Sequence, residues 1–292
     1  MIERLLAWVI IIVDKFIPKR KNNGNTLIFI DGGIGDLVMY MPAIGLFYFS
    51  HQVTFYCNQQ PHKDILKEHF PQSDFDLSKN FGCAAWDCHV KKKHILFVML
   101  KRIPVRIGEP SDKWSPFFTL CNKGIYQVDI NQYSLEQKMF FNTHKPDIRL
   151  PKNYIVIHPF NSHRGRSKEY PRWDKVMNQL MYDRTLIVMI GGKEERKYTE
   201  FNWMNFLDLR GKLTIFESAW VIQRSKHFYT NEGGMAHIAA ALGVRSTIYI
   251  REDIRESTIH KHMKHLKYHT WRKRVPVNLY DVEDNINATI NI

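Results

Sequence analysis

The stretch TNEGGMAHIAAALG, residues 230–243, places an acid, two glycines and a histidine directly before an apolar helix pattern. Gly233 and Gly234 would let the first amides of the helix approach an anion, and the helix dipole adds about half a positive charge there. Glu232 could bind neutral hydroxyl groups beside that anion, and His237, one turn into the helix, could face the same ligand. A buried structural histidine is the alternative for His237. The stretch predicts a site for a phosphate-bearing ligand.

A second stretch, IHPFNSHRGRSKEYPRW, residues 157–173, reads as a strand end, a basic loop and a helix opened by proline. Arg164, Arg166 and Lys168 crowd this loop. Such a loop at a strand end suits a diphosphate and the negative charge that develops when a diphosphate leaves. The alternative is that the loop is basic because it is exposed to solvent and that it binds no ligand.

Two further turns combine glycines with an acid, DGGIGD at 31–36 and IGGKEE at 190–195. In the first, Gly35 and Asp36 open a helix, and the carboxylate could act as a general base or only cap the helix. It is not a GxGxxG pattern, because Asp36 stands where a glycine is needed. In the second, Gly192 and Glu195 could hold a ribose hydroxyl, or the acid could again be a cap.

These motifs need strand-to-helix turns, and the sequence supplies them in two series. We expect strands at 26–30, 53–56, 94–99, 105–107, 154–157, 185–190, 208–210, 227–229 and 246–250, and helices at 36–49, 63–69, 134–141, 173–181, 194–202, 215–223 and 237–242. The prediction is an α/β protein with two facing Rossmann-like domains and a site in the cleft between them, at the carboxyl ends of strands. The expected division is a segment 1–24, a domain 25–150 that binds the acceptor and a domain 151–292 that binds the nucleotide.

The composition is that of a globular protein with a basic surface. Hydrophobic residues make up 44% of the chain, enough for a core, and the formal net charge of +13 favours polyanionic partners. Cys57, Cys83, Cys88 and Cys121 lack the paired spacing of a metal site, so we expect reduced thiols in a cytosolic protein.

An apolar run at 5–13 is followed by Asp14, Lys15 and the basic residues 19–21. The run is too short to cross a bilayer, which takes about 20 residues. A helix in the membrane interface fits better, with its apolar side in lipid and its basic flank on anionic headgroups. A first helix packed on the protein's own core is the alternative.

Four motifs then occur in one order: GD-(x)5-P from Gly35 to Pro42, K-x-aromatic-P at 168–171, GG-x-x-acid at 191–195 and acid-x-G-x-x-H at 232–237. Together they resemble glycosyltransferase family nine, the group of the lipopolysaccharide heptosyltransferases, over about residues 26–250. The resemblance implies the GT-B arrangement of two Rossmann-like domains.

The resemblance also implies roles for matching residues. Asp36 matches the catalytic base, Lys168 the lysine that neutralises the departing diphosphate, and Glu195 the acid near the ribose. Gly234 and His237 match the phosphate-binding helix start. The family's usual Asp and Ser/Thr are replaced by glutamate at 232 and glycine at 233, which alters the expected contact with the donor sugar.

The implied reaction is a metal-independent, inverting transfer of a sugar from a nucleotide donor, with ADP-heptose as one candidate, and without a cofactor. The acceptor would be a lipopolysaccharide core or another phosphorylated glycolipid. The protein would then lie on the inner face of the cytoplasmic membrane, held to the anionic surface by residues 1–22. Two alternatives stay open: a glycosyltransferase acting on nucleic acid, which the apolar N-terminus does not favour, and a non-catalytic nucleotide-sugar-binding protein.

Overall fold

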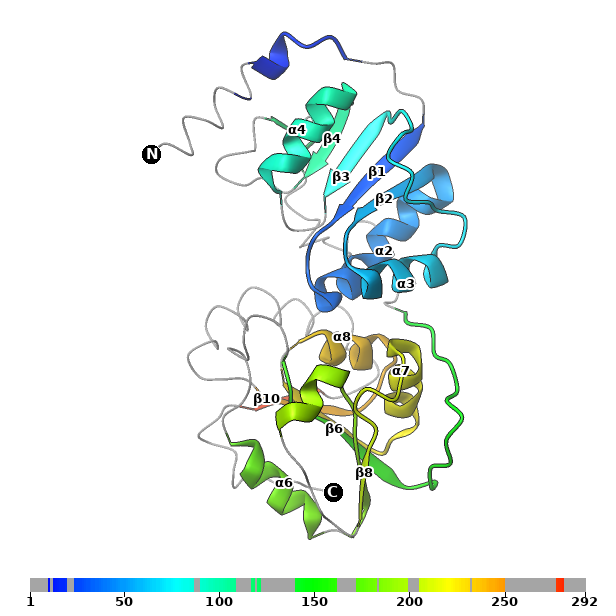
Figure 1. Cartoon of the computed structure of the whole chain (residues 1–292), viewed down its shortest axis with the longest axis vertical. Coiled ribbons are helices and arrows are strands. Elements are labelled where there is room, and N and C mark those ends of the chain that lie inside the picture. The colour runs from blue at the N-terminus through cyan, green and yellow to red at the C-terminus, as the bar shows by residue number, and fades with distance from the viewer. Residues whose placement is uncertain are drawn as a thin grey trace. The chain divides into compact units, whose positions relative to one another are not determined.

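The structure is a computed structural model in which the chain divides into two compact units, Met1–Gln137 and Lys138–Ile292. Each unit is built on its own parallel sheet (Figure 1). The described residues are 10, 13–19, 24–86, 90–108, 117–118, 120–121, 140–161, 172–182, 184–198, 205–231, 233–249 and 277–280.

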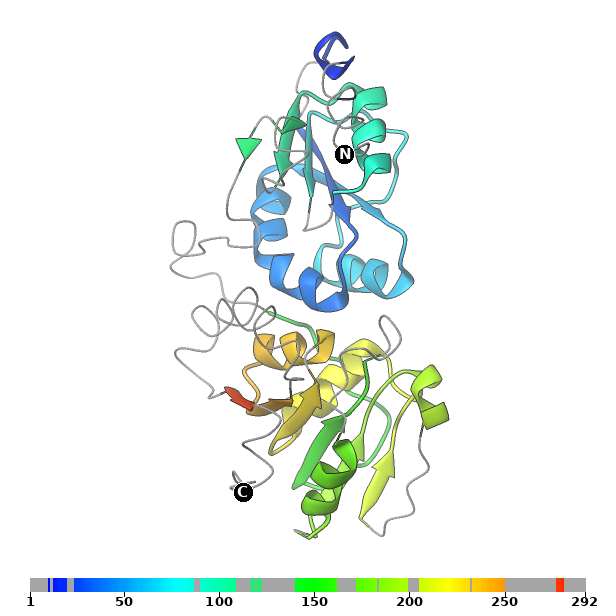
Figure 2. The same cartoon turned by 90° about the vertical axis from the view of Figure 1, so that its left-hand side faces the viewer.

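The first unit contains a five-stranded sheet in the order β2-β1-β3-β4-β5, all parallel. Its elements are β1 Asn25–Ile30, α2 Ile34–Ser50, β2 Gln52–Cys57, α3 Gln60–His69, β3 Cys83–Trp86, α4 Lys92–Lys101, β4 Val105–Gly108 and β5 Leu120–Cys121. The predicted strands at 26–30, 53–56 and 105–107 and the helices at 36–49 and 63–69 are confirmed. Because β1 lies between β2 and β3, the chain reverses its direction of winding after β2, and α2 and α4 cover opposite faces of the sheet (Figure 2).

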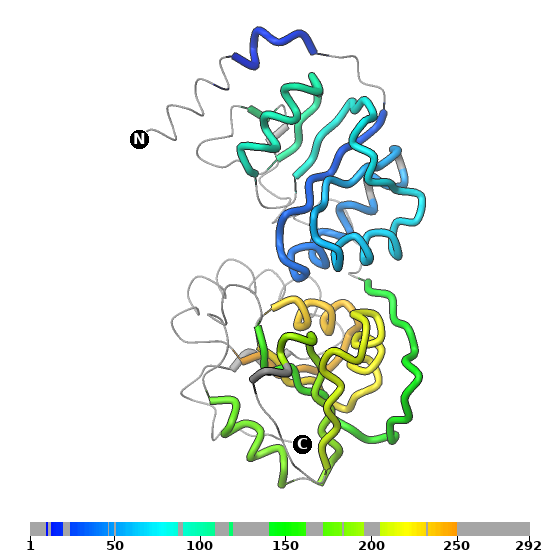
Figure 3. The backbone as a smooth tube through the Cα atoms, viewed as in Figure 1, coloured from blue at the N-terminus to red at the C-terminus, as the bar shows by residue number. Residues whose placement is uncertain are grey.

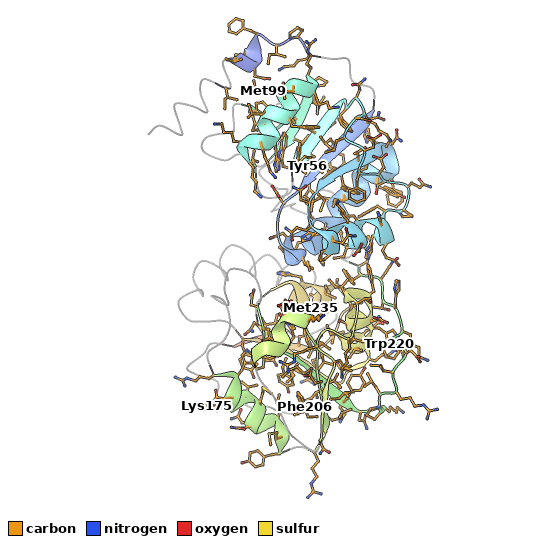
Figure 4. All side chains as sticks on the ribbon, viewed as in Figure 1. Tyr56, Met99, Lys175, Phe206, Trp220 and Met235 are labelled. Carbon is orange, nitrogen blue, oxygen red and sulfur yellow. The ribbon has the colours of Figure 1, made fainter. Side chains whose placement is uncertain are left out.

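The strand predicted at 94–99 is wrong, because this segment forms α4. His94, Ile95, Val98 and Met99 are its buried residues, and their spacing is that of one helical face. A short apolar run is compatible with a strand or a helix, and here the packing of the run on Leu27 and Phe29 decides. The side chain of Met99 is labelled in Figure 4.

A segment before β1 packs on the same core as α4. Ile10 and the partly buried Ile17 belong to that core, while Val13 and Phe16 remain 49% and 82% exposed. Asp14 is buried, and its Oδ1 accepts a hydrogen bond of 2.9 Å from Nη2 of Arg106 on β4. Burial alone would raise the pKa of Asp14, but hydrogen bonds from Arg106 and Lys19 outweigh it and hold this pKa below its ordinary value. No helix among the described parts of the chain is both long and apolar enough to cross a membrane.

The second unit contains a six-stranded parallel sheet in the order β11-β10-β9-β6-β7-β8. Its elements are β6 Tyr154–His158, α6 Trp173–Met181, β7 Leu186–Met189, the 3-10 helix η2 Lys193–Tyr198, β8 Phe206–Asp208, α7 Ile215–Arg224, β9 Phe228–Asn231, α8 Gly234–Ala241, β10 Ser246–Tyr249 and β11 Val277–Tyr280. Alternate residues of β6 enter different cores: Ile155 and Ile157 pack with α6, whereas Tyr154 and Val156 pack with α7 and α8. This period of two places helices on both faces of the sheet.

Most elements predicted for the second unit are confirmed, with three differences. The described part of the segment predicted as a helix at 194–202 is the 3-10 helix η2. The strand expected at 208–210 is β8, which begins at Phe206 and ends at Asp208, and β11 was not predicted. Trp220 of α7 and Met235 of α8 pack on this unit's core (Figure 4).

Residues 140–150, predicted to belong to the domain 25–150, pack on the second unit. The N–H of His144 donates to the carbonyl of Phe216 at 3.1 Å, and the ring of Phe141 stacks on that of Phe216. Figure 3 traces this stretch until it enters β6. Phe140 and Phe141 are not helical; the rest of the helix predicted at 134–141 lies outside the described residues.

Candidate active site

The first candidate is the turn between β1 and α2, here called the Asp36 turn, residues 31–36. Oδ2 of Asp36 accepts the N–H of Gly33 at 2.7 Å, so the carboxylate closes the first turn of α2. A Cβ atom on Gly32 would lie 2.6 Å from Cβ of Asp36, which makes glycine necessary at this close approach. Asp36 therefore caps the helix, and its half-buried side chain lies at the carboxyl end of β1. The capping bond uses Oδ2, and the role of Asp36 as a base stays a prediction.

Helices α3 and α4 hold the Asp36 turn in place. Nε2 of His62, which is 2% exposed, lies 3.1 Å from the carbonyl oxygen of Gly32 and must donate, because a carbonyl only accepts. Asp31 lies 2.8 Å from Nζ of Lys91 and 3.0 Å from Nε2 of the fully buried His94. Burial lowers the pKa of His94 to about 4, although Asp31 acts in the opposite direction. The turn thus rests on an imidazole that is neutral at neutral pH.

The second candidate is the turn after β7, here called the Glu195 turn, residues 190–195. Oε2 of Glu195 accepts the N–H of Gly192 at 2.7 Å, the same closure as in the Asp36 turn. Gly191 has φ +154°, and a Cβ atom there would lie 2.2 Å from Oε2 of Glu195. Glu195 is only 4% exposed. The turn therefore encloses its carboxylate much more fully than the Asp36 turn does.

A histidine and an arginine lie beside Glu195. Nε2 of His158, at the end of β6, lies 3.5 Å from Oε2, and Arg210 donates to the backbone carbonyl of Glu195 at 2.9 Å. Asp208 in turn binds Arg210, with Nη2 2.8 Å from Oδ2. Burial would raise the pKa of Glu195, but the hydrogen bond from His158, its charge, the Gly192 amide and Arg210 together lower it. The carboxylate is therefore ionised at neutral pH and held in one orientation.

The third candidate is the start of α8, where the residues Gly233, Gly234 and His237 lie. Gly233 is the N-cap, and a Cβ atom on it would lie 3.5 Å from Nδ2 of Asn161, an ordinary contact. The end of the β6 strand and the α8 start are therefore neighbours. His237 is 4% exposed, and the helix has no acid in its first turn. The N–H groups of Ala236 and His237 donate to the carbonyl of Gly233 at 3.1 and 3.4 Å, so the N–H groups of Gly234 and Met235 are the ones that could bind an anion.

Asn231, the last residue of β9, holds the β6 loop against this helix start. Its Oδ1 accepts from Nε1 of Trp173 at 2.8 Å, and its Nδ2 donates to the carbonyl of Pro159. Thr230 donates to the carbonyl of His158 at 3.2 Å. Polar side chains at the ends of β6 and β9 thus position the loop that leads to the predicted basic residues.

The structure brings some predicted residues together. In the second unit, Gly192 contacts Glu195, and Gly233 lies beside the β6 loop, while Gly35 and Asp36 belong to the first unit. Arg164, Arg166, Lys168 and Glu232 lie outside the described residues. Sequence reasoning missed four residues that shape the second unit's site, namely His158, Asn161, Asp208 and Arg210. The position of His158 and Asn161 at a strand end was the signal that could have found them.

Within the described segments, no group of three or more His, Cys, Asp or Glu side chains could hold a metal ion. Cys57 and Cys83, the cysteines whose state is described, are free and buried. Burial raises the pKa of Cys83 to about 11, so this thiol is protonated at neutral pH.

Residues 55–258, well over half of the chain, match the family model described as Glycosyltransferase family 9 (heptosyltransferase). The match includes the Glu195 turn and the start of α8 and begins after the Asp36 turn. No curated protein sequence matches this chain.

Solved structures with the same fold include ADP-heptose LPS heptosyltransferase II of E. coli, with a TM-score of 0.58 and 13% identity over 87% of this chain and 89% of that one. A family 9 glycosyltransferase from Veillonella parvula matches with a TM-score of 0.55 and 12% identity over 79% of this chain and 82% of the other. Heptosyltransferase WaaC of E. coli with ADP matches with a TM-score of 0.54 and 13% identity over 83% of this chain and 99% of the other. These likenesses confirm the predicted GT-B fold of two Rossmann-like domains. The chain belongs to glycosyltransferase family 9 and is a glycosyltransferase.

Proposed function

We propose that this glycosyltransferase moves a heptose from ADP-heptose to a hydroxyl of a lipopolysaccharide core or another phosphorylated surface glycolipid. The observation that carries the proposal is the second unit's site, where an enclosed, ionised Glu195 and the first turn of α8 lie at the carboxyl ends of parallel strands. An ionised carboxylate suits ribose hydroxyls, and the amides suit a diphosphate. The solved relatives whose names mention ADP or ADP-heptose support the choice of donor.

In the proposed reaction, Asp36 takes the proton of the acceptor hydroxyl as that oxygen attacks the anomeric carbon. The bond between this carbon and the diphosphate breaks on the opposite face, so the configuration inverts. Lys168, with Arg164 and Arg166, neutralises the charge that grows on the leaving nucleoside diphosphate. These protein groups supply positive charge, so the proposed transfer uses no metal ion.

Gly233 is the residue that we expect to influence the donor sugar. Among the described residues, a Cβ atom there would make an ordinary contact of 3.5 Å with Asn161. The missing side chain leaves room beside the first amides of α8. We infer that a substituent of the donor sugar uses this room, and Gly233→Ser tests it through the ratio of kcat/KM for two ADP-sugars.

Because the proposed acceptor is a glycolipid, the enzyme would work at a membrane surface. Residues 1–22 would bind the anionic inner face of the cytoplasmic membrane. Val13 and Phe16 are available for that contact, whereas Ile10 and Ile17 pack on the protein core. Each basic residue near an anionic surface contributes about 1 kcal/mol to binding.

Thermal stabilisation by ADP, GDP, UDP and CMP tests the donor site, with Lys168→Ala and His237→Ala measured alongside. We expect ADP to raise the melting temperature of the wild type and both variants to lose most of the shift. A response to another nucleotide would contradict the donor, and no response to any would contradict the site.

Transfer is then measured with ADP-heptose and a deacylated, water-soluble core oligosaccharide. NMR of the product gives its anomeric configuration, and retention would contradict the proposed direct displacement. Loss of activity in EDTA, restored by a divalent ion, would contradict the absence of a metal.

A further inference from the structure

Helix α4 of the first unit has an outward apolar stripe that no described element covers. His94, Ile95, Val98 and Met99 face the core, whereas Leu96 and Leu100 are 42% and 82% exposed. The two leucines are four residues apart and therefore adjacent on one side of the helix, with Lys92 one turn before them. A single exposed leucine is ordinary, but a row of two on a basic helix resembles an interfacial surface.

The N-terminal segment adds apolar groups on the same side of the sheet. Ile10 and Ile17 share the core cluster of α4, and the buried ion pair between Asp14 and Arg106 fixes the segment to β4. Val13 and Phe16 then remain exposed. Figures 1 and 2 show the dark blue segment beside one end of α4.

The segments that carry these exposed apolar side chains are rich in basic residues. Residues 90–108 include six Lys or Arg and no Asp or Glu. In residues 13–19 the acid is Asp14, which is buried and paired with Arg106 and Lys19, and Lys15 is exposed. The exposed Lys91, Lys92 and Lys93 stand at the N-terminus of α4, where the helix dipole favours acids. Within the chain, Lys91 pairs with Asp31 and Lys93 lies over the ring of Tyr56, so the lysine beside the exposed leucines that an external anionic surface would favour is Lys92.

We propose that α4 and the N-terminal segment form a membrane-docking face, defined by Val13, Phe16, Lys92, Leu96 and Leu100. Its occupant is an anionic bilayer surface: the apolar side chains enter the interface and the lysines contact headgroups. This extends the membrane association of the proposed function from residues 1–22 to a folded helix, and it rests on that part of the proposal. Lipid binding by this face does not require sugar transfer.

Vesicle co-sedimentation of the full chain tests the face. The vesicles contain phosphatidylglycerol and phosphatidylethanolamine, with pure phosphatidylcholine for comparison. We expect Leu96→Glu/Leu100→Glu to weaken binding to the anionic vesicles at least about tenfold, and Phe16→Glu to weaken it less. The matched control is Met181→Glu/Tyr182→Glu, which changes two exposed residues at the end of α6 in the second unit and should bind like the wild type.

Three results would overturn the docking face: wild-type binding by the Leu96/Leu100 variant, equal loss in the Met181/Tyr182 control, or equal binding to phosphatidylcholine. A dimer in light scattering that the Leu96/Leu100 variant dissociates would make the face an interface between copies instead. The melting temperature and its shift with ADP, measured on each variant, establish that it is folded. Transfer to the deacylated acceptor should stay unchanged in the Leu96/Leu100 variant, so failure of the docking face and failure of the proposed function give different results.

Discussion

The Asp36 turn and the Glu195 turn have the same local chemistry in different surroundings. Each has two glycines followed by an acid three residues after the second, and in each the carboxylate accepts that glycine's N–H at 2.7 Å. Asp36 lies in the first turn of α2, a helix of 17 residues, and is half-buried, while Glu195 is 4% exposed beside His158 and Arg210. The comparison teaches that one turn motif can present an accessible acid or enclose an acid, depending on what packs around it.

Asp36→Asn should have the largest effect. The amide keeps an oxygen that can cap α2 but cannot take a proton, so kcat for transfer should fall about 10²–10⁴-fold. The ADP-dependent thermal shift should be unchanged, because that site belongs to the second unit. Activity within a few-fold of the wild type would show that Asp36 is only a cap.

Lowering the pH should destabilise the protein through His94, which lies beside the Asp36 turn. The pKa of His94 is about 4 in the folded protein and about 6.5 when unfolded, so between these values the unfolded chain binds more protons. Stability is therefore lost as the pH falls from 6.5 to 4, by at most about 3 kcal/mol from this group. Urea titrations of wild type and His94→Gln should show a flatter pH profile for the variant; parallel profiles would contradict the assignment.

The glycines can be compared as matched pairs. Gly191→Ala adds strain at φ +154° and a clash with Glu195, and should destabilise the protein by about 1–3 kcal/mol. Gly192→Ala, whose Cβ would lie 3.9 Å from Oε2 of Glu195, should change stability by less than about 1 kcal/mol. Gly32→Ala and Gly33→Ala should repeat this contrast in the first unit, with the larger loss at Gly32. Equal effects within either pair, in chemical denaturation, would contradict the close approach.

Glu195→Gln should have the smallest effect. Losing the charge beside His158 and Arg210 should weaken ADP binding about tenfold, or about 1.4 kcal/mol, in calorimetry at pH 7. Because the folded pKa of Glu195 is depressed, its stabilising contribution is present above its ordinary value of 4.5 and disappears as the pH falls through the lower folded value. The difference in stability between wild type and variant should therefore shrink below pH 4.5. A difference that persists there would mean that shape, and not charge, supports the turn.

Most of the elements could be predicted because their patterns are local. The glycine turn after 26–30 and the proline-opened helix at 173 carry their own signals. The segment 94–99 was predicted wrongly because its five consecutive apolar residues fit either period. Strand β3 was missed because Cys83-Ala-Ala-Trp86 is short and poor in β-branched residues. Both errors concern segments whose state depends on burial against β1.

In the candidate site, too, features with a local signal could be predicted, and contacts between distant residues could not. Glycines and acids near a strand end could be recognised, since their roles depend on neighbours within a few residues. The contact of Glu195 with His158 joins residues 37 positions apart, and Gly233 and Asn161 follow different strands, so neither proximity has a local signal. The exposed leucines of α4 were likewise hidden until the helix had a buried side.

The sequence by itself therefore determined the α/β class, the two series of turns and the chemistry that each turn could perform. Those properties follow from backbone freedom, helix polarity and apolar spacing, which act over a few residues. Only the tertiary structure decided that α4 is a helix with an apolar outer face, that β1 lies between β2 and β3, and that Glu195 is enclosed while Asp36 is accessible. These properties depend on strand pairing and burial between distant segments, because the environment of a carboxylate is set by what packs around it.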